Sequence, residues 1–260
     1  MTQNIYFDAA PPLGEIVLNA PEKRNALSVA MWTAIPGLIE AANRSDQIKV
    51  ILIHGGDAGA FAAGVDISEF ETLYATPEST KASTEQTDRA LAAIEQSQKP
   101  VIAAIDGPCF GAGLALALAA DIRIASLGAK FGIPPVKLGV LFPPADLLRL
   151  LRTVGPGLTK ELIFTARVFG AEEAKDIRLV DRVTQEAGAI SAARTMATDI
   201  AAQSQWSVRA NKEMIRGLQS GWRPDGEAAQ DLFLRGFQGD DFKEGYTAFL
   251  EKRPAKFPSV

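Results

Sequence analysis

The stretch at residues 99–124, KPVIAAIDGPCFGAGLALALAADIRI, limits the possible fold more than any other part of the sequence. Residues 101–105 form a short and continuously apolar run, which is typical of a strand buried on both faces. A turn with three glycines follows, and residues 114–120 are then only Leu and Ala, which form helices well but offer no polar face. The stretch therefore predicts a buried strand, a glycine turn and a buried helix.

The glycine turn fits two different roles. A turn that leads into a helix leaves backbone N–H groups free at the helix start, where the helix dipole favours negative charge. The turn with Gly107, Gly111 and Gly113 is therefore suited to holding an oxyanion. The same glycines also suit a plain strand–turn–helix connection, in which they allow close packing. These residues alone leave both roles open.

Residues 50–70 repeat this arrangement. The apolar run VILIH at 50–54 ends at two glycines, and the small-residue turn FAAGVDISEF at 61–70 leads into a predicted helix. Strands that alternate with helices indicate an α/β domain with largely parallel strand pairing. Such sheets bind ligands beyond the carboxyl ends of their strands, and both glycine turns lie at such ends.

The rest of the chain extends the α/β pattern and then becomes helical. In the first half we predict a strand at 15–19 and a helix from the N-cap Ser28 to about residue 43, which Pro36 is expected to kink. A mobile or irregular segment at 71–83 and a helix at 84–97 follow. Beyond the glycine turn we predict strands at 122–125 and 130–132, helices at 145–154, 157–166 and 171–177, and a strand at 179–183. From Ala187 onward we expect helices, with breaks near Trp206, 221–224 and Gly239. We therefore predict a core with the functional site at residues 1–190 and a helical oligomerisation region at residues 191–260.

Composition argues against several classes of site. A net charge of −4 with 22% charged residues disfavours an extended nucleic-acid-binding surface, which requires a basic face. Cys109 and His54 are the single cysteine and the single histidine, so we expect no intramolecular disulfide and no zinc site. A Ser–His–Asp or Cys–His system could use only His54 and is therefore disfavoured. The N-terminal residues lack a signal-peptide pattern, and no apolar run approaches the roughly 20 residues that span a membrane. We expect a cytoplasmic protein with no metal and no membrane or nucleic-acid partner.

Seven segments in a fixed order carry a resemblance to a known family. They are VLNAPEKRNALS at 17–28, FAAGVDISEF at 61–70, AAIDGPCFGAGLALALAADIRIA at 103–125, KFGIPPVKLGV at 130–140, LLRTVGP at 150–156, GAEEAKDIRLVDRV at 170–183 and EKRPAKF at 251–257. Together they resemble the crotonase superfamily, the enoyl-CoA hydratase/isomerase fold. The resemblance implies an α/β fold in which repeated ββα units form a spiral of two sheets. It also implies a helical C-terminal region that builds a homotrimer, and two such trimers often stack into a hexamer.

The resemblance further implies an acyl-CoA thioester as the ligand, with no cofactor beyond the coenzyme A of the substrate. The shared chemistry is stabilisation of a thioester enolate by two backbone N–H groups, and these positions fall on Val65 and Ala112. The implied CoA path passes residues 62–67, with Arg24 or Lys23 near the phosphates. The positions implied to contact CoA are Arg24, Ala26, Ala63, Asp66, Ile67 and Gly111.

The acid–base positions of the family are occupied by residues that cannot exchange a proton. Family hydratases activate water with two glutamates, and the corresponding positions here hold Ala115 and Pro135. The position that carries a carboxylate in related dehalogenases and dienoyl isomerases holds Pro143. We therefore do not expect the familiar hydratase mechanism. Asp146 is the candidate for proton transfer because the following leucines would raise its pKa, although an Asp in the first turn of a helix equally suits a structural role.

Three functional hypotheses follow. The first is an enzyme of the hydratase/isomerase type, a lyase or an isomerase, that acts on an acyl-CoA through an enolate. The second is a protein of the same fold that binds acyl-CoA without turnover. The third, a hydrolase of β-dicarbonyl compounds, is disfavoured because such members use histidines. Apolar residues at the expected acyl end favour an apolar acyl group, although core packing explains them equally well: Leu114, Leu141, Phe142 and Leu147.

Overall fold

The structure is a computed structural model, and it describes residues 4–185 and 188–258. Its main sheet has six strands in the order β1-β2-β3-β4-β6-β9. Their bounds are β1 Ile5–Ala10, β2 Leu13–Leu18, β3 Val50–His54, β4 Val101–Ile105, β6 Ile122–Ser126 and β9 Arg182–Thr184. Only the pair β1–β2 is antiparallel among these strands. A smaller sheet of three strands contains β5 Pro108–Phe110, β7 Lys130–Gly132 and β8 Phe169–Gly170.

The central strands β3 and β4 are buried on both faces, as their continuous apolar runs predict. Alternate residues of β4 serve two different hydrophobic clusters. Val101, Ala103 and Ile105 belong to the larger cluster, whereas Ile102 and Ala104 belong to the smaller one on the other side of the sheet. The period of two along the strand thus divides one apolar run between two cores.

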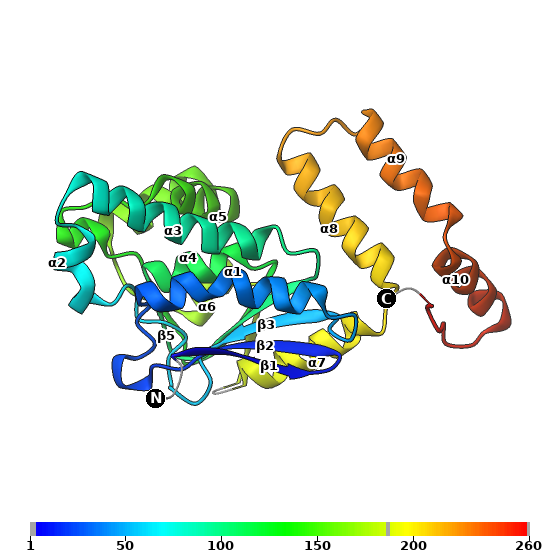
Figure 1. Ribbon diagram of the computed structural model, residues 1–260, viewed down its shortest axis with the longest axis horizontal. Coiled ribbons are helices and arrows are strands. Elements are labelled where there is room, and N and C mark those ends of the chain that lie inside the picture. Colours follow the sequence, from blue (N-terminus) through cyan, green and yellow to red (C-terminus); the bar gives the residue numbers. More distant parts are fainter. Residues whose placement is uncertain (1–3, 186–187, 259–260) are drawn as a thin grey trace.

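Helices cover both faces of the main sheet (Figure 1). Four of them lie on the side of the larger cluster: α1 Val29–Arg44, α3 Pro77–Glu95, α4 Ala112–Ala119 and α5 Pro144–Thr165. On the other face, α7 Ala189–Ala201 packs against β3, β4 and β6 through Ala193 and Ala197. The remaining short helices of the core are η1 Pro21–Lys23, η2 Ile67–Glu69, α2 Phe70–Leu73, η3 Pro135–Leu138 and α6 Ala171–Asp176.

Most of the segment at 71–83 is helical, so the prediction that it is irregular is wrong. Helix α3 begins at Pro77, and Thr76 forms a capping box with Ser79 at its N-terminus. Proline at the first helical position is favourable because its missing N–H would have no intrahelical partner. The capping residues account for the polar composition that had suggested a loop.

Other element boundaries agree with the sequence or differ for simple reasons. Ser28 caps α1 as predicted, and α1 continues through Pro36. Helix α5 contains a non-helical residue, Gly155 with φ 80°, at the division between the two helices predicted there. Strand β1 was not predicted because it is an edge strand with mostly exposed residues.

The C-terminal helices α8 Gln205–Gln219, α9 Glu227–Arg235 and α10 Asp240–Glu251 stand away from the core (Figure 1). A short helix, η4 Gly236–Gln238, precedes α10. The boundary expected at residue 190 falls inside α7, which packs on the sheet, and the projecting helices begin after residue 201. The helical breaks expected near Trp206, at 221–224 and near Gly239 are confirmed, because the chain leaves helical structure at 202–204, at 220–226 and at Gly239. Ala187 lies outside the described residues.

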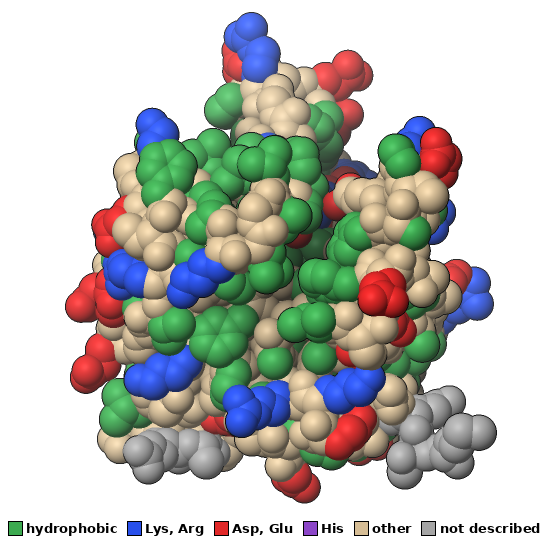
Figure 2. Space-filling model, turned by 90° about the vertical axis from the view of Figure 1, so that its left-hand side faces the viewer, with side chains coloured by type: hydrophobic (Ala, Val, Ile, Leu, Met, Phe, Trp, Pro, Cys, Tyr) green, Lys and Arg blue, Asp and Glu red, His purple; other side chains and the backbone are tan. Residues whose placement is uncertain are grey.

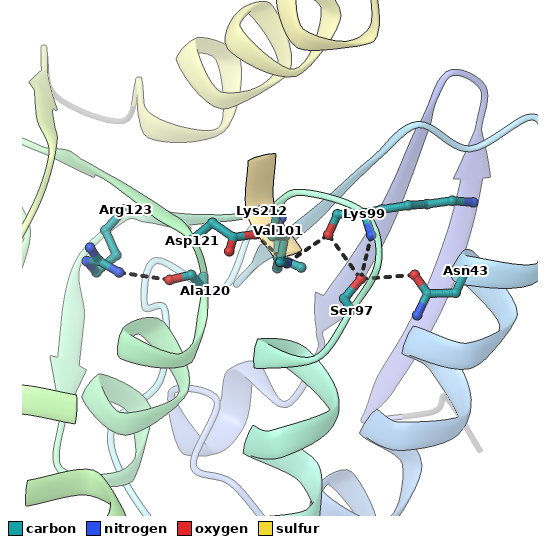
Figure 3. Close-up of polar contacts among 8 residues, drawn as sticks. All are labelled: Asn43, Ser97, Lys99, Val101, Ala120, Asp121, Arg123 and Lys212. Carbon is teal, nitrogen blue, oxygen red and sulfur yellow. Dashed lines mark hydrogen bonds and ion pairs between the residues drawn. The ribbon is translucent and has the colours of Figure 1, made fainter. Parts of the chain in front are cut away.

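A partly exposed polar contact joins α8 to the start of β4 (Figure 3). The Nζ of Lys212 donates to the carboxylate of Asp121 at 2.6 Å and to the carbonyl oxygen of Lys99 at 2.9 Å. The same Asp121 oxygen, Oδ2, accepts the N–H of Val101 at 2.7 Å. One carboxylate oxygen therefore connects the projecting helices to the first residue of a central strand.

The single histidine is part of a buried structural cluster. His54 Nε2 lies 2.8 Å from Glu15 Oε2, and the N–H of Gly56 donates to His54 Nδ1 at 3.1 Å. Arg194 of α7 donates to both oxygens of Glu15 at 2.7 Å, and these hydrogen bonds are the main reason why the pKa of Glu15 is lowered. The cluster fixes α7 on the sheet and leaves His54 no free nitrogen for catalysis.

Candidate active site

The two glycine turns predicted from the sequence lie directly against each other. Ala62, after β3, forms a parallel bridge with Cys109, after β4. The N–H of Ala62 donates to Pro108 O, and the N–H of Phe110 donates to Ala62 O, each at 3.0 Å. Turns that follow neighbouring parallel strands thus meet at the carboxyl edge of the sheet, where such sheets bind ligands.

Glycines allow this close approach. A Cβ atom on Gly113 would lie 2.4 Å from the carbonyl oxygen of Ala62, so no side chain fits there. Gly111 has φ 50°, in the left-handed region that favours glycine, and it directly precedes α4. The N–H of Gly111 donates to Gly132 O at 3.0 Å, which joins the end of β7 to the same turn.

Val65 and Ala112 present backbone N–H groups that donate to no atom of the described residues. Val65 is held by its neighbours, because Leu27 donates to Gly64 O at 2.7 Å and Asp66 donates to Leu27 O at 3.1 Å. Ala112 is the first residue of α4, where N–H groups have no intrahelical acceptor. Both donors belong to the paired turns, and the dipole of α4 favours negative charge at Ala112.

Asn25 holds the first turn in place, and the sequence analysis missed this role. Its side chain accepts the N–H of Ala20 at 2.8 Å and donates to the carbonyl oxygens of Gly55 at 3.1 Å and Ala60 at 2.9 Å. Asn25 is fully buried with φ 55°, a conformation that Asn tolerates better than most residues. An Asn next to a proline-containing turn was the available signal.

The residues expected to contact CoA differ in whether their side chains are already paired and in how exposed they are. Lys23 is held by Asp66 at 2.6 Å, and this hydrogen bond, followed by one from Ser68, lowers the pKa of Asp66. The guanidinium of Arg24 is exposed and has no ion pair with any described residue, and its carbonyl oxygen accepts the N–H of Ala63. Ala26 is half-buried, whereas Ile67 is 72% exposed.

Ala115 and Pro135, where the family resemblance leads one to expect glutamates, lie close to the same turns. Ala115 is buried inside α4, one turn after Ala112. Pro135 begins η3, immediately after Pro134, whose Cδ would lie 3.8 Å from a Cβ on Gly111. Neither Ala115 nor Pro135 can bind or release a proton.

Asp146 is the third residue of α5 and is only 3% exposed. Arg149 donates to its Oδ1 at 2.8 Å, while no described residue donates to its Oδ2. Burial outweighs Arg149 and raises the pKa of Asp146 to about 6. Arg149 itself is fixed by Glu95 of α3 through two hydrogen bonds of 2.8 Å. Asp146 is therefore a desolvated carboxylate with one oxygen fixed and one oxygen unpaired.

The leucines expected around Asp146 and at the acyl end are divided between core and surface. Leu150 is buried, whereas Leu147, Leu148 and Leu151 are 38–44% exposed. Of the four residues expected at the acyl end, Leu114 and Phe142 are buried in the core, whereas Leu141 and Leu147 are exposed. Figure 2 shows hydrophobic side chains gathered around a hollow on the face that carries α2 and the start of α5.

Other chemistries have no support within residues 4–185 and 188–258. That part of the chain contains no group of three His, Cys, Asp or Glu residues that could hold a metal ion. Cys109 is buried, and its burial raises the pKa of the thiol. None of the described helices has the length and apolar content needed to cross a membrane.

Comparisons with known proteins agree with this geometry. The family model described as enoyl-CoA hydratase/isomerase matches residues 10–259. A crystal structure of an enoyl-CoA hydratase/isomerase family protein from Hyphomonas neptunium is 61% identical, covers 100% of this chain and 99% of its own, and superposes with a TM-score of 0.98. A crotonyl-CoA hydratase from Syntrophomonas wolfei is 35% identical over 99% of this chain and 98% of its own length. A short-chain-enoyl-CoA hydratase from Clostridium acetobutylicum is 32% identical over 96% of this chain and 95% of its own.

Proposed function

Because the chain belongs to the enoyl-CoA hydratase/isomerase family of the crotonase superfamily, we propose that it converts an acyl-CoA thioester through an enolate held by the N–H groups of Val65 and Ala112. The observation that carries the proposal is the pair of free donors on two turns that touch each other. Donors fixed in advance stabilise the charge that develops on the thioester oxygen, and each is typically worth 10²–10³ in rate.

Arg24 is the proposed contact for the CoA phosphates. Its guanidinium is exposed and unpaired among the described residues, whereas the neighbouring Lys23 is held by Asp66. A guanidinium binds phosphate oxygens in a two-pronged geometry. The rest of the proposed CoA path is formed by Ala26, Ala63, Asp66, Ile67 and Gly111, which belong to the same turns or border them.

Asp146 is the proposed proton-transfer group. With Ala115 and Pro135 at the two family positions, the paired-glutamate route to hydration has no residues to perform it. The unpaired Oδ2 of Asp146 and its pKa of about 6 suit a base that works near neutral pH. Helix α5, which carries Asp146, packs against α4, which begins at Ala112. We assign Asp146 to removing or returning the proton at the acyl α-carbon, a step common to hydration and isomerisation.

Exchange of the α-protons of butyryl-CoA in D₂O, followed by proton NMR, tests the proposed function. Enolate formation replaces these protons by deuterium even when the full reaction needs another acyl group, so we expect exchange well above the buffer rate. Calorimetry with the same thioester measures binding separately. Binding without enhanced exchange would make the protein a non-catalytic acyl-CoA binder, and absence of binding at millimolar thioester would contradict the proposal.

We also propose that α8–α10 assemble the chain into a homotrimer or a dimer of trimers. Exposed aromatic residues follow one another along these helices, with ring centroids 5.2–6.3 Å apart: Phe233, Phe237, Phe242 and Tyr246. Phe249 is 81% exposed beside them. An exposed apolar surface of this kind indicates a protein contact. Sedimentation equilibrium should give the mass of three or six chains of 27.7 kDa, and a single-chain mass would contradict the assembly.

A further inference from the structure

A second hollow, of about 390 Å³, lies far from the candidate active site. Its walls are the loop at residues 97–98, which precedes β4, and the facing sides of α8 and α9. The candidate oxyanion turn follows the opposite end of β4, and a strand of five residues spans about 16 Å. The hollow is therefore separate from the turns that carry Val65 and Ala112.

Positive charge dominates the lining of this hollow. Arg209, Lys212 and Arg216 follow one face of α8, and Arg235 of α9 lies across from them. Glu213 is the one carboxylate among the lining residues. Like charges at this spacing on a helix repel one another, and an anion bound between them would reduce that repulsion.

Two of these cations are available to a ligand. The guanidinium groups of Arg216 and Arg235 are exposed, and neither has a hydrogen bond or ion pair with any described residue. Lys212 is instead held by Asp121 and the carbonyl oxygen of Lys99 (Figure 3). Lys212 therefore adds positive charge to the wall of the hollow, but its ammonium group already donates to Asp121 and Lys99.

The pKa values of two neighbouring lysines, Lys99 and Lys212, also respond to these positive charges. The pKa of Lys99 is lowered to about 8, first by burial and then by the charges of Arg209 and Lys49, against a smaller opposite effect of Asp46. Burial also lowers the pKa of Lys212; Asp121 opposes this shift, and the charge of Arg216 adds to it. At Lys99 the nearby carboxylate of Asp46 therefore offsets only part of the surrounding positive charge.

We propose that this hollow binds a small molecule that carries a phosphate or pyrophosphate group. Guanidinium groups on facing helices can each grip phosphate oxygens with two hydrogen bonds. The volume falls in the range of small-molecule sites. Trp206 and Leu232 in the lining offer an aromatic and an apolar surface to the non-phosphate part of the ligand.

Calorimetric titration with inorganic pyrophosphate tests the site, using the wild-type protein and the double variant Arg216→Gln/Arg235→Gln. The double variant loses two charge-assisted contacts, so we expect it to bind at least about tenfold more weakly. Arg223→Gln is the matched control, because Arg223 is exposed, pairs with Asp225 and does not line the hollow. Its affinity should equal that of the wild type.

Three results would overturn the proposal. One is the absence of binding at millimolar pyrophosphate, and another is equal binding by the double variant and the wild type. The third is loss of binding in Arg24→Gln, which would place the anion at the proposed CoA contact. Sedimentation of the double variant completes the test, because a change in the number of assembled chains would assign Arg216 and Arg235 to a subunit contact. Butyryl-CoA exchange by the double variant should stay at the wild-type rate.

Discussion

Replacing Ala112 by proline is expected to lower the rate of α-proton exchange by about 10²–10³-fold. Proline removes the backbone N–H that we assign to the enolate oxygen, and loss of one such donor typically has an effect of this size. Ala112 is the first residue of α4, the helical position where proline is best tolerated, so the substitution changes the donor with little cost to the helix. The measurement is the exchange rate of butyryl-CoA protons at saturating thioester.

Ala112→Ser is the matched control for this variant. Serine keeps the N–H and adds a small side chain at a half-buried position, so exchange should remain within a few-fold of the wild-type rate. Thermal unfolding of both variants separates a lost donor from a lost fold. Full exchange activity in a folded Ala112→Pro variant would show that this N–H does not hold the enolate.

The variant Asp146→Asn is expected to lower the same exchange rate by about 10²-fold or more, the usual contribution of a general base. The base must be ionised to take a proton, and the pKa of Asp146 is raised to about 6. Wild-type exchange should therefore rise with pH through about 6 and become constant above it. The residual activity of Asp146→Asn should lack this step, which a pH profile between about 5 and 8 would show.

Stability should respond to Asp146→Asn in the opposite direction from activity. Because the folded pKa of Asp146 lies above its ordinary value of 3.8, the protein binds a proton more tightly when folded. The contribution of Asp146 to the free energy of unfolding is then fully present below about pH 4 and is lost as the pH rises through about 6, and asparagine removes this pH dependence. Glu85→Gln, which changes an exposed carboxyl of α3 that does not contribute to the pKa shift of Asp146, is the control. Exchange by Asp146→Asn within about threefold of the wild type would contradict the assignment.

Local patterns in the sequence predicted the elements that local forces determine. Residues 50–54 and 101–105 agree with β3 and β4 because continuous apolar runs have no stable place outside a covered sheet. The segment at 71–83 was misread because Thr76, Pro77 and Ser79 resemble a loop in composition, although in combination they start a helix. The edge strand β1 offered no such run, since most of its residues are exposed.

The candidate site was predictable where it consists of backbone, and less so where it depends on distant partners. Glycine spacing indicated both turns, and the close approach of Gly113 to Ala62 explains why glycine stands there. Asn25 binds carbonyl groups 30 and 35 positions away, and Glu95 binds Arg149 from 54 positions away. Such pairs depend on the completed fold, so the sequence could suggest Asp146 but not the charges around it.

The oxygen atom that Asp121 shares between Val101 and Lys212 has a practical consequence for protein engineering. The C-terminal helices project from the core, but α8 supplies the cation that neutralises the Asp121 carboxylate next to the first residue of β4. Cutting the chain after α7 would leave Asp121 and the carbonyl oxygen of Lys99 without that cation, at the start of the strand whose far end leads to Ala112. A shortened core is therefore a poor substitute for the whole chain in screening inhibitors or substrates.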